Sequence, residues 1–266
     1  MEFKGIDVSK WNGNIDWKKV KNSGIDFAIL REGYGKENPN QIDKKFEENY
    51  TNAKKQGVHL GVYHYVYADS VEDAINEAKF CLKNIKRKQL DYPIVIDIED
   101  KEQLKLSNRQ RTDIVKAFCN EIKKAGYYAM FYCNLNWLKS YLFKDELLQK
   151  YDLWLAQWSN NKPSCFCGIW QYSSCGKVEG ISGNVDLNIS YKNYPEIIKN
   201  KGLNGFSKTS NSKNKSYLSY TVKKGDSLWK ISEKYLGNGN KYKKIKDLNN
   251  LSSDTIYPNQ VLKIPK

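Results

Sequence analysis

The sequence predicts an α/β fold: an irregular TIM-like barrel of five strand–helix units and three bare strands, (β/α)5(β)3, followed by a small βααβ domain. Three observations support this. Short apolar runs alternate with helix-length segments five times from the N-terminus, which is typical of a parallel sheet, open or closed into a barrel. Three more apolar runs then follow with only short polar gaps. A polar, low-complexity stretch finally separates this region from a short C-terminal one.

The first five apolar runs predict parallel strands. They are rich in β-branched and aromatic side chains, as strand segments are. They cover residues 3–8, 27–31, 58–66, 92–98 and 127–133.

The segments between these runs have the length and the amphipathic pattern of helices. The predicted helices cover residues 42–56, 71–86 and 109–125. Ser107 and Gln110 have the spacing of a capping box, in which the serine satisfies a free amide at the helix start. Gly57 and Gly126 follow two of the helices, at the position where many helices end in a residue with left-handed backbone conformation.

The last three apolar runs differ from the first five in their connections. They cover residues 153–156, 168–172 and 185–189, and the gaps between them are rich in Ser, Asn, Pro and Gly. A parallel crossover needs about a dozen residues or more, usually including a helix. We therefore expect antiparallel pairs among these strands, and a barrel completed by three bare strands instead of a regular eightfold one.

The composition divides the chain into a barrel domain, a flexible linker and a small domain, at residues 1–202, 203–219 and 220–265. The linker is polar and low in complexity, as flexible tethers are. The pattern of the small domain predicts a strand, a helix capped by Asp226 or Ser227, a second helix near residues 242–248 and a final strand.

Positive charge is concentrated in the C-terminal part of the chain. The net charge is +14, and residues 203–266 contain thirteen lysines and four acids, which supply +9 of it. Such a region steers a protein towards polyanions: nucleic acids, anionic membranes, or the teichoic acids and carboxylates of a Gram-positive wall. A solubilising surface would have the same composition.

The sequence carries no sign of a membrane span or a leader. No stretch approaches the roughly 20 consecutive apolar residues that a spanning helix needs, so we expect no membrane insertion. The N-terminus enters a strand pattern without a basic flank or a long apolar run. We therefore expect a protein without a signal peptide that is made in the host cytoplasm.

The six cysteines are few for a disulfide framework in a chain of 266 residues. Cys81, Cys119 and Cys133 stand in apolar patterns, as small buried hydrophobes do. Cys165 and Cys167 are one residue apart, and the two histidines lie far upstream, which does not fit a zinc site. We expect no metal and no cofactor.

The strongest local sign of chemistry is in residues 94–100, where a buried-strand pattern ends in carboxylates. Asp97 and Glu99 share a face at the C-terminal end of the strand, where barrel enzymes place catalytic groups. Two carboxyls in a partly apolar site cannot both ionise easily, so one pKa rises and that group can act as an acid near neutral pH. Glycoside hydrolysis uses such a pair. A solvated acidic loop would give the same local pattern.

Other strand ends favour the catalytic interpretation. Asp7 ends the first strand and Asp186 lies in the last, and these two strands are neighbours in a closed barrel. Aromatic side chains on shared strand faces join them: Tyr63, Tyr65, Trp154 and Trp158. Acids and aromatics around one mouth describe a sugar cleft. His64 alternates to the other face of its strand, so we interpret it as a packed structural histidine.

Residues 1–200 resemble the glycoside hydrolase family 25 lysozymes, the Chalaropsis-type muramidases found among phage endolysins and bacterial autolysins. The resemblance rests on six segments in order: Gly5-Ile6-Asp7-Val8-Ser9, Gly61-Val62-Tyr63-His64-Tyr65, Asp97-Ile98-Glu99, Leu153-Trp154-Leu155-Ala156, Trp170-Gln171-Tyr172-Ser173 and Val185-Asp186-Leu187-Asn188.

This resemblance implies cleavage of the β-1,4 bond after N-acetylmuramic acid in peptidoglycan. It implies Glu99 as general acid, with Asp97, Asp7 and Asp186 as partners in the cleft. Its implied substrate contacts are Arg31, at a position where many members carry lysine, and the aromatic residues Tyr63, Tyr132 and Trp154.

The C-terminal region resembles a LysM module over residues 220–265. The matching segments are residues 220–232 and residues 256–265. The resemblance implies binding of N-acetylglucosamine-containing glycan in a groove between the loops 225–228 and 255–260. The residues expected to contribute are Gly225, Asp226, Ser227, Leu228, Ile256 and Pro258.

Three other functions compete with this hypothesis. A chitinase-type hydrolase would carry an acid two residues before Asp97, where this chain has Val95. A wall-binding lectin without activity would seldom need four unpaired carboxyls at one mouth. Nucleic-acid binding is disfavoured because the lysines cluster on the sugar-binding module. A phage endolysin, released through a holin, is favoured over a bacterial autolysin by the lack of a signal peptide.

Overall fold

The computed structural model describes residues 2–208, 217–251, 253–258 and 260–265. The chain divides into two compact units, residues 1–209 and 210–266. Each unit is described by itself below.

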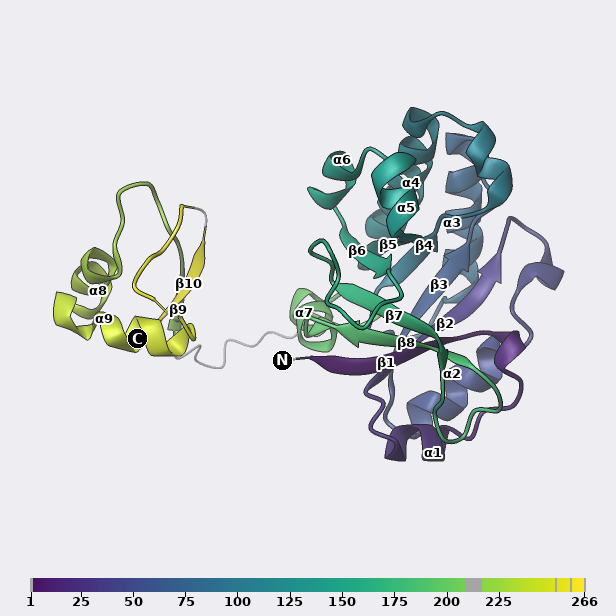
Figure 1. Ribbon diagram of the computed structural model, residues 1–266, viewed down its shortest axis with the longest axis horizontal. Helices are drawn as coiled ribbons and strands as arrows, with labels where there is room; N and C mark the ends of the chain where they lie inside the picture. The colour runs from purple at the N-terminus through teal and green to yellow at the C-terminus, as the bar shows by residue number, and fades with distance from the viewer. Residues whose placement is uncertain (1, 209–216, 252, 259, 266) are drawn as a thin grey trace. The chain divides into compact units, whose positions relative to one another are not determined.

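The larger unit is a closed eight-stranded barrel with its strands in sequence order (Figure 1). The strands are β1 (Phe3–Val8), β2 (Phe27–Tyr34), β3 (His59–Tyr65), β4 (Ile94–Asp97), β5 (Ala129–Asn134), β6 (Asp152–Ala156), β7 (Ile169–Gly176) and β8 (Val185–Ser190). Neighbours from β1 to β7 are parallel, whereas β8 is antiparallel to both β7 and β1. The predicted irregular barrel with antiparallel pairs near its end is therefore confirmed.

Helices follow each of the first five strands (Figure 1). They are α1 (Trp17–Asn22), α2 (Phe46–Lys55), α3 (Val71–Asn84), α4 (Asn108–Lys124), α5 (Leu135–Ser140) and α6 (Lys144–Leu148), and α7 (Tyr194–Lys201) follows β8. The predicted capping box is present at α4, where Ser107 and Gln110 bond each other's backbone amides. Gly57 and Gly126 adopt the positive φ expected after α2 and α4, 72° and 83°.

Helix α2 begins four residues later than the sequence pattern predicts. Ile42 instead pairs with Gly33, and the amide of Asp43 donates to the carbonyl of Glu32 at 2.9 Å. The Asp43 carboxylate accepts from the amide of Lys45 at 2.9 Å, which turns the chain into the helix. The segment before α2 therefore lies along β2 and extends that strand to Tyr34.

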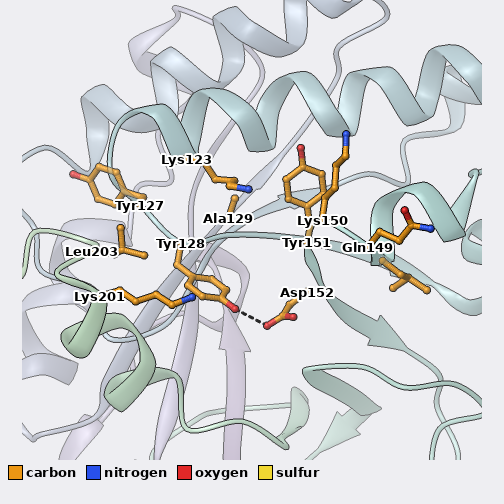
Figure 2. Close-up of a pocket in the computed structure, with 11 residues that line it drawn as sticks. Lys123, Tyr127, Tyr128, Ala129, Gln149, Lys150, Tyr151, Asp152, Lys201 and Leu203 are labelled. Carbon is orange, nitrogen blue, oxygen red and sulfur yellow. Dashed lines mark hydrogen bonds between the residues drawn. The ribbon is translucent and has the colours of Figure 1, made fainter. Parts of the chain in front are cut away.

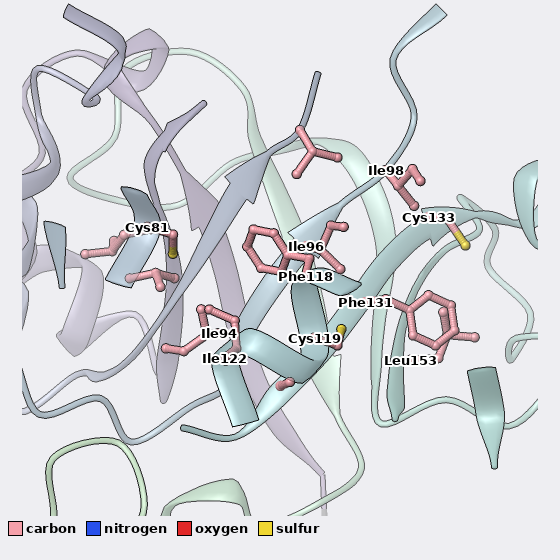
Figure 3. Packing of buried hydrophobic residues seen from close by; sticks show 14 of the residues in the cluster. Cys81, Ile94, Ile96, Ile98, Phe118, Cys119, Ile122, Phe131, Cys133 and Leu153 are labelled. Atoms are coloured by element: carbon pink, nitrogen blue, oxygen red, sulfur yellow. The ribbon is translucent and has the colours of Figure 1, made fainter. Parts of the chain in front are cut away.

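Two apolar layers hold the barrel together. One lies between strands and helices, where Ile94 and Ile96 of β4 pack with Phe118 and Ile122 of α4 (Figure 3). The other fills the barrel interior and contains Phe27, Ile29, Val95, Met130, Trp154 and the α7 residues Tyr194 and Ile198. The alternation of β4 residues between these layers sets which side chains face the barrel axis. The predicted buried cysteines Cys81, Cys119 and Cys133 lie in the outer layer.

The smaller unit has the predicted βααβ order. It contains β9 (Tyr217–Thr221), α8 (Leu228–Leu236), α9 (Tyr242–Leu248) and β10 (Val261–Pro265), and the two strands pair antiparallel. Its core consists of Val222, Leu228, Ile231, Ile245, Leu262 and Ile264. Ser227 caps α8 by accepting from the amide of Lys230, whereas Asp226 holds the preceding turn through the amide of Lys223.

Both ends of the predicted linker 203–219 belong to ordered units. The buried Asn204 side chain donates to the carbonyls of Leu90 and Tyr92 at 3.0 and 2.8 Å and accepts from the amide of Tyr128 at 2.7 Å. Residues 217–219 are part of β9, and residues 209–216 lie outside the described residues. Among the described residues, no helix is both long and apolar enough to cross a membrane.

Candidate active site

Asp7 and Asp186 form one half of a carboxyl cluster at the mouth of the barrel. They are direct partners in the antiparallel register of β1 and β8, so their side chains lie on one face. Asp7 is buried and accepts from Gln171 Nε2 at 2.9 Å and from Asn188 Nδ2 at 2.7 Å. These two amides fix the position of one carboxyl oxygen.

Burial and the charge of Asp186 raise the pKa of Asp7 to about 8, although both amide hydrogen bonds act in the opposite direction. Burial also raises the pKa of Asp186 to about 6. Both groups therefore titrate near neutral pH.

Asp97 and Glu99 form the other half of the cluster. Asp97 is buried at the end of β4, and its Oδ1 has no hydrogen-bond partner among the described residues. Burial, then the charges of Glu99 and Asp7, raise the pKa of Asp97 well above its usual range. Burial also raises the pKa of Glu99, against a hydrogen bond from Asn134 Nδ2 at 3.4 Å. Their effects on one another's pKa link all four predicted acids, and the raised pKa values favour protonated carboxyls that can donate a proton to a substrate.

The aromatic residues Tyr63, Tyr132 and Trp154 form the floor between these acids. The Trp154 ring packs edge-on against Tyr132 and Tyr63, with centroids 4.6 and 6.1 Å away. Trp154 is only 1% exposed, and its Nε1 donates to Asn188 Oδ1 at 2.8 Å. Trp154 therefore offers little surface to a ligand here, and its expected contact with a sugar stays a prediction. Through this hydrogen bond Trp154 positions Asn188, which holds Asp7.

Trp158 is at the mouth, but not for the predicted reason. Strand β6 ends at Ala156, so strand alternation does not place Trp158 on the face of Trp154. The Trp158 ring is 63% exposed in the following loop, and its Nε1 donates to Gln171 Oε1 at 3.1 Å. Tyr132 donates to the same oxygen at 3.2 Å. Gln171 thus connects an exposed ring to Asp7.

A cavity of about 300 Å³ continues the mouth beyond β2 and β3. Its lining residues are Lys10, Trp11, Arg31, Tyr34, Tyr65 and Tyr67. The Arg31 guanidinium is held by Asp43, with both nitrogen–oxygen distances below 3 Å, at 2.7 and 2.8 Å. Tyr65 donates to Asp100 at 3.2 Å. The aromatic faces and the Lys10 ammonium suit a sugar that carries a carboxylate, because the charge of Arg31 is already balanced by Asp43.

Sequence reasoning did not select several residues of this mouth. Gln171 and Asn188 lie inside motifs quoted above, but as uncharged amides they carry no pattern of their own. Lys10 and Trp11 directly follow the β1 strand end, and Trp11 is 78% exposed. In the sequence, the available signal was a tryptophan four residues after Asp7, close to the end of the same strand.

His64 faces away from the mouth, as predicted. It packs against Phe118 on the outer side of the barrel, and its Nδ1 contacts Glu32. Its Nε2 lies 2.9 Å from the carbonyl of Gly35 and 3.2 Å from Glu77. Burial alone would lower the pKa of His64, but the two glutamates outweigh it and raise that pKa to about 9.

The same glutamates also bond to the chain after β3 and to the end of α3. Glu77 accepts from the amide of Tyr67 at 3.1 Å, and Asn84 donates to Glu32 at 2.9 Å. The ligating atoms of Glu32, His64 and Cys81 all lie within 4.8 Å of one another, as in a metal site. Both ring nitrogens of His64 are already engaged by Glu32, Gly35 and Glu77, and burial raises the pKa of the Cys81 thiol well above its usual range. This cluster is built for hydrogen bonding.

The predicted glycan-binding residues of the small unit lie on its two loops. Gly225, Ile256 and Pro258 are at least partly exposed. The Leu228 side chain packs in the core of the small unit, and the expected contribution of this residue to the groove stays a prediction. Asp226 and Ser227 are engaged in the turn and the helix cap. Asn259, within the predicted groove, lies outside the described residues.

A closed α/β barrel that gathers four carboxyls and several aromatic rings at its mouth is an architecture of glycoside hydrolases. Residues 6–181 match the model of glycosyl hydrolases family 25, and the chain belongs to this family. Residues 220–265 match the model of the LysM domain.

Known relatives agree with this assignment. Lysozyme M1 of Streptomyces globisporus is 30% identical over 199 residues, covering 70% of this chain and 66% of that protein. The autolytic lysozyme of Clostridium acetobutylicum is 30% identical over 187 residues, covering 70% of this chain and 55% of that protein. The structure of the CTP1L endolysin has a TM-score of 0.65 at 30% identity and covers 74% of this chain and 69% of that one. The chain thus spans 55–66% of the length of these two curated relatives.

Proposed function

We propose that this protein is a peptidoglycan hydrolase of the muramidase type. It cleaves the β-1,4 bond between N-acetylmuramic acid and N-acetylglucosamine in Gram-positive walls. The observation that carries the proposal is the cluster of Asp7, Asp97, Glu99 and Asp186 at the mouth of a family 25 barrel. Two relatives of this barrel are named lysozymes.

In this proposal Glu99 protonates the leaving oxygen. Its raised pKa keeps a proton available, and it is less buried than Asp97, so a substrate reaches it more easily. Asp97 lies deeper and orients the N-acetyl group next to the reacting carbon. This N-acetyl group acts as the internal nucleophile. Asp7 and Asp186 adjust the charge of the mouth and hydrogen-bond the sugar.

The small unit holds the enzyme on its substrate. Its match to the LysM domain supports binding to N-acetylglucosamine-containing glycan. A second binding unit on one chain raises the effective concentration of the barrel at the wall without taking part in the chemistry.

Mass spectrometry of digested peptidoglycan tests the proposed reaction. Muramidase action leaves N-acetylmuramic acid at each new reducing end. Reducing N-acetylglucosamine ends, or peptides released without sugar cleavage, would contradict it, and a lectin without activity would release nothing. A phage origin stays a prediction, since the relatives include an autolytic lysozyme and an endolysin.

A further inference from the structure

A second cavity lies at the opposite end of the barrel strands from the carboxyl cluster. It has a volume of about 270 Å³ and lies where β5 and β6 begin, beside the ends of α4 and α7. Figure 2 shows Lys123 entering from α4, Lys201 from α7, and the Tyr128 ring beside Lys201. Its position at the amino ends of the strands separates it from the mouth that the proposed reaction uses.

The cavity has an excess of positive charge. Lys123, Lys150 and Lys201 line it, and within the described part of the chain no carboxylate forms an ion pair with any of the three. The single acid of the lining, Asp152, is already neutralised by Lys192 at 2.7 Å. It also accepts hydrogen bonds from the hydroxyls of Tyr128 at 2.8 Å and Tyr194 at 2.9 Å. Three cations therefore remain available to an anion.

Aromatic rings hold two of these cations at the cavity. The Lys201 ammonium lies 5.5 Å from the centroid of Tyr128, and that of Lys123 lies 5.3 Å from the centroid of Tyr151. Cation–π contacts of this length restrict the flexible lysine stems. Tyr151 is also buried, so its ring is poorly placed to stack on a nucleobase. Tyr128 is partly exposed, but its ring is engaged with Lys201.

We propose that this cavity binds the phosphate groups of a base-free phosphodiester polymer of the cell wall. Lysine ammonium groups are compact charges that suit phosphate oxygens. The cavity is close to the lower limit for small-molecule pockets, which fits a single polyol- or sugar-phosphate unit. The barrel would then bind the wall polymer directly, at a site separate from the small unit and from the carboxyl cluster at the mouth.

Binding of soluble poly(glycerol phosphate) to the full chain tests the site by isothermal titration calorimetry. The pocket variant carries Lys123→Gln, Lys150→Gln and Lys201→Gln. The matched control carries Lys18→Gln, Lys44→Gln and Lys55→Gln, three exposed lysines of the barrel that do not line the cavity. The control loses the same charge, so only a specific site separates the two variants.

We expect the pocket variant to bind poly(glycerol phosphate) about tenfold more weakly than the control variant does. A tenfold loss of affinity corresponds to three ion pairs of modest strength. Equal losses in both variants would overturn the proposal, because general attraction would then explain the binding. Preference for polyglutamate or single-stranded DNA over poly(glycerol phosphate) would also overturn it.

Acetylation footprinting of the unmodified chain gives a second readout that needs no variant. Saturating polymer should protect Lys123, Lys150 and Lys201 but leave Lys18 and Lys44 reactive; uniform protection would contradict the site.

The pocket variant should also digest phosphate-free peptidoglycan at the unmodified rate. Loss of the proposed reaction itself would leave the footprint unchanged, so the two proposals fail independently.

Discussion

Asp7 and Asp186 lie directly opposite each other where β1 and β8 pair, and the charge of Asp186 adds to burial in raising the pKa of Asp7. The first and last strands of the barrel thus bring together two carboxyls that are far apart in sequence. Gln171 and Asn188 fix Asp7 on one oxygen, at 2.9 and 2.7 Å. This pairing leads to two predictions.

The Asp186→Asn variant should lower the pKa of Asp7, which is about 8 in the unmodified protein. Removal of a negative neighbour makes ionisation of Asp7 easier. The limb of the profile of kcat/KM against pH that reflects Asp7 therefore moves to lower pH. The dependence of kcat/KM on pH checks this. An unchanged limb would mean that Asp186 does not act on Asp7.

The Asp7→Asn variant should be more stable than the unmodified protein at neutral pH while losing activity. The folded pKa of Asp7 lies above the unfolded value, so ionisation destabilises the fold as pH rises from about 4 to about 8. The gain should be roughly 1–3 kcal/mol, or several degrees in Tm. Thermal unfolding at pH 4 and pH 7 checks it, since the gain should vanish at the lower pH. A loss of stability at pH 7 would contradict the prediction.

The His64→Ala variant should lose stability in a pH-dependent way. His64 has a folded pKa of about 9, above its unfolded value, so its contribution is complete below about pH 6.5 and is lost as pH rises through about 9. Breaking a buried ion pair costs about 3–5 kcal/mol. Urea unfolding at pH 6 and pH 10 should show a larger difference between variant and unmodified protein at pH 6. A constant difference would mean that His64 stabilises by packing alone.

Truncation after residue 208 should leave a folded, active barrel that binds whole walls less tightly. Truncation after Lys201 should instead destabilise the barrel, because it removes Asn204 and its bonds to the carbonyls of Leu90 and Tyr92. Unfolding of both fragments and co-sedimentation with walls distinguish these outcomes. Equal stability of the two fragments would contradict the role assigned to Asn204.

Most of the fold was predictable because apolar alternation is strong in the strands. Alternation also gave the correct outward direction of His64. It failed at Trp158, since β6 ends before that residue, and at the start of α2, where Asp43 keeps the chain beside β2. These errors arise from contacts between segments that are distant in sequence.

The carboxyls of the site were predictable, and the groups that hold them were not. Four acids at strand ends are visible in the sequence as charge. Gln171, Asn188 and Asn134 act through hydrogen bonds whose partners depend on the closed barrel. The burial of Trp154 follows from its contacts with Tyr132 and Tyr63 across the interior, which no local pattern encodes.

The rate at which the Glu99→Gln variant produces new N-acetylmuramic acid reducing ends tests the account most directly. Gln keeps the shape of the side chain but removes its proton, so the rate should fall on the order of 10²–10⁴ while wall binding is unchanged. Glu102→Gln is the matched control, an exposed acid of the same segment that pairs with Lys105, and it should keep the unmodified rate. A Glu99→Gln variant that still produces these ends at a near-normal rate would contradict the assignment of Glu99 as the acid.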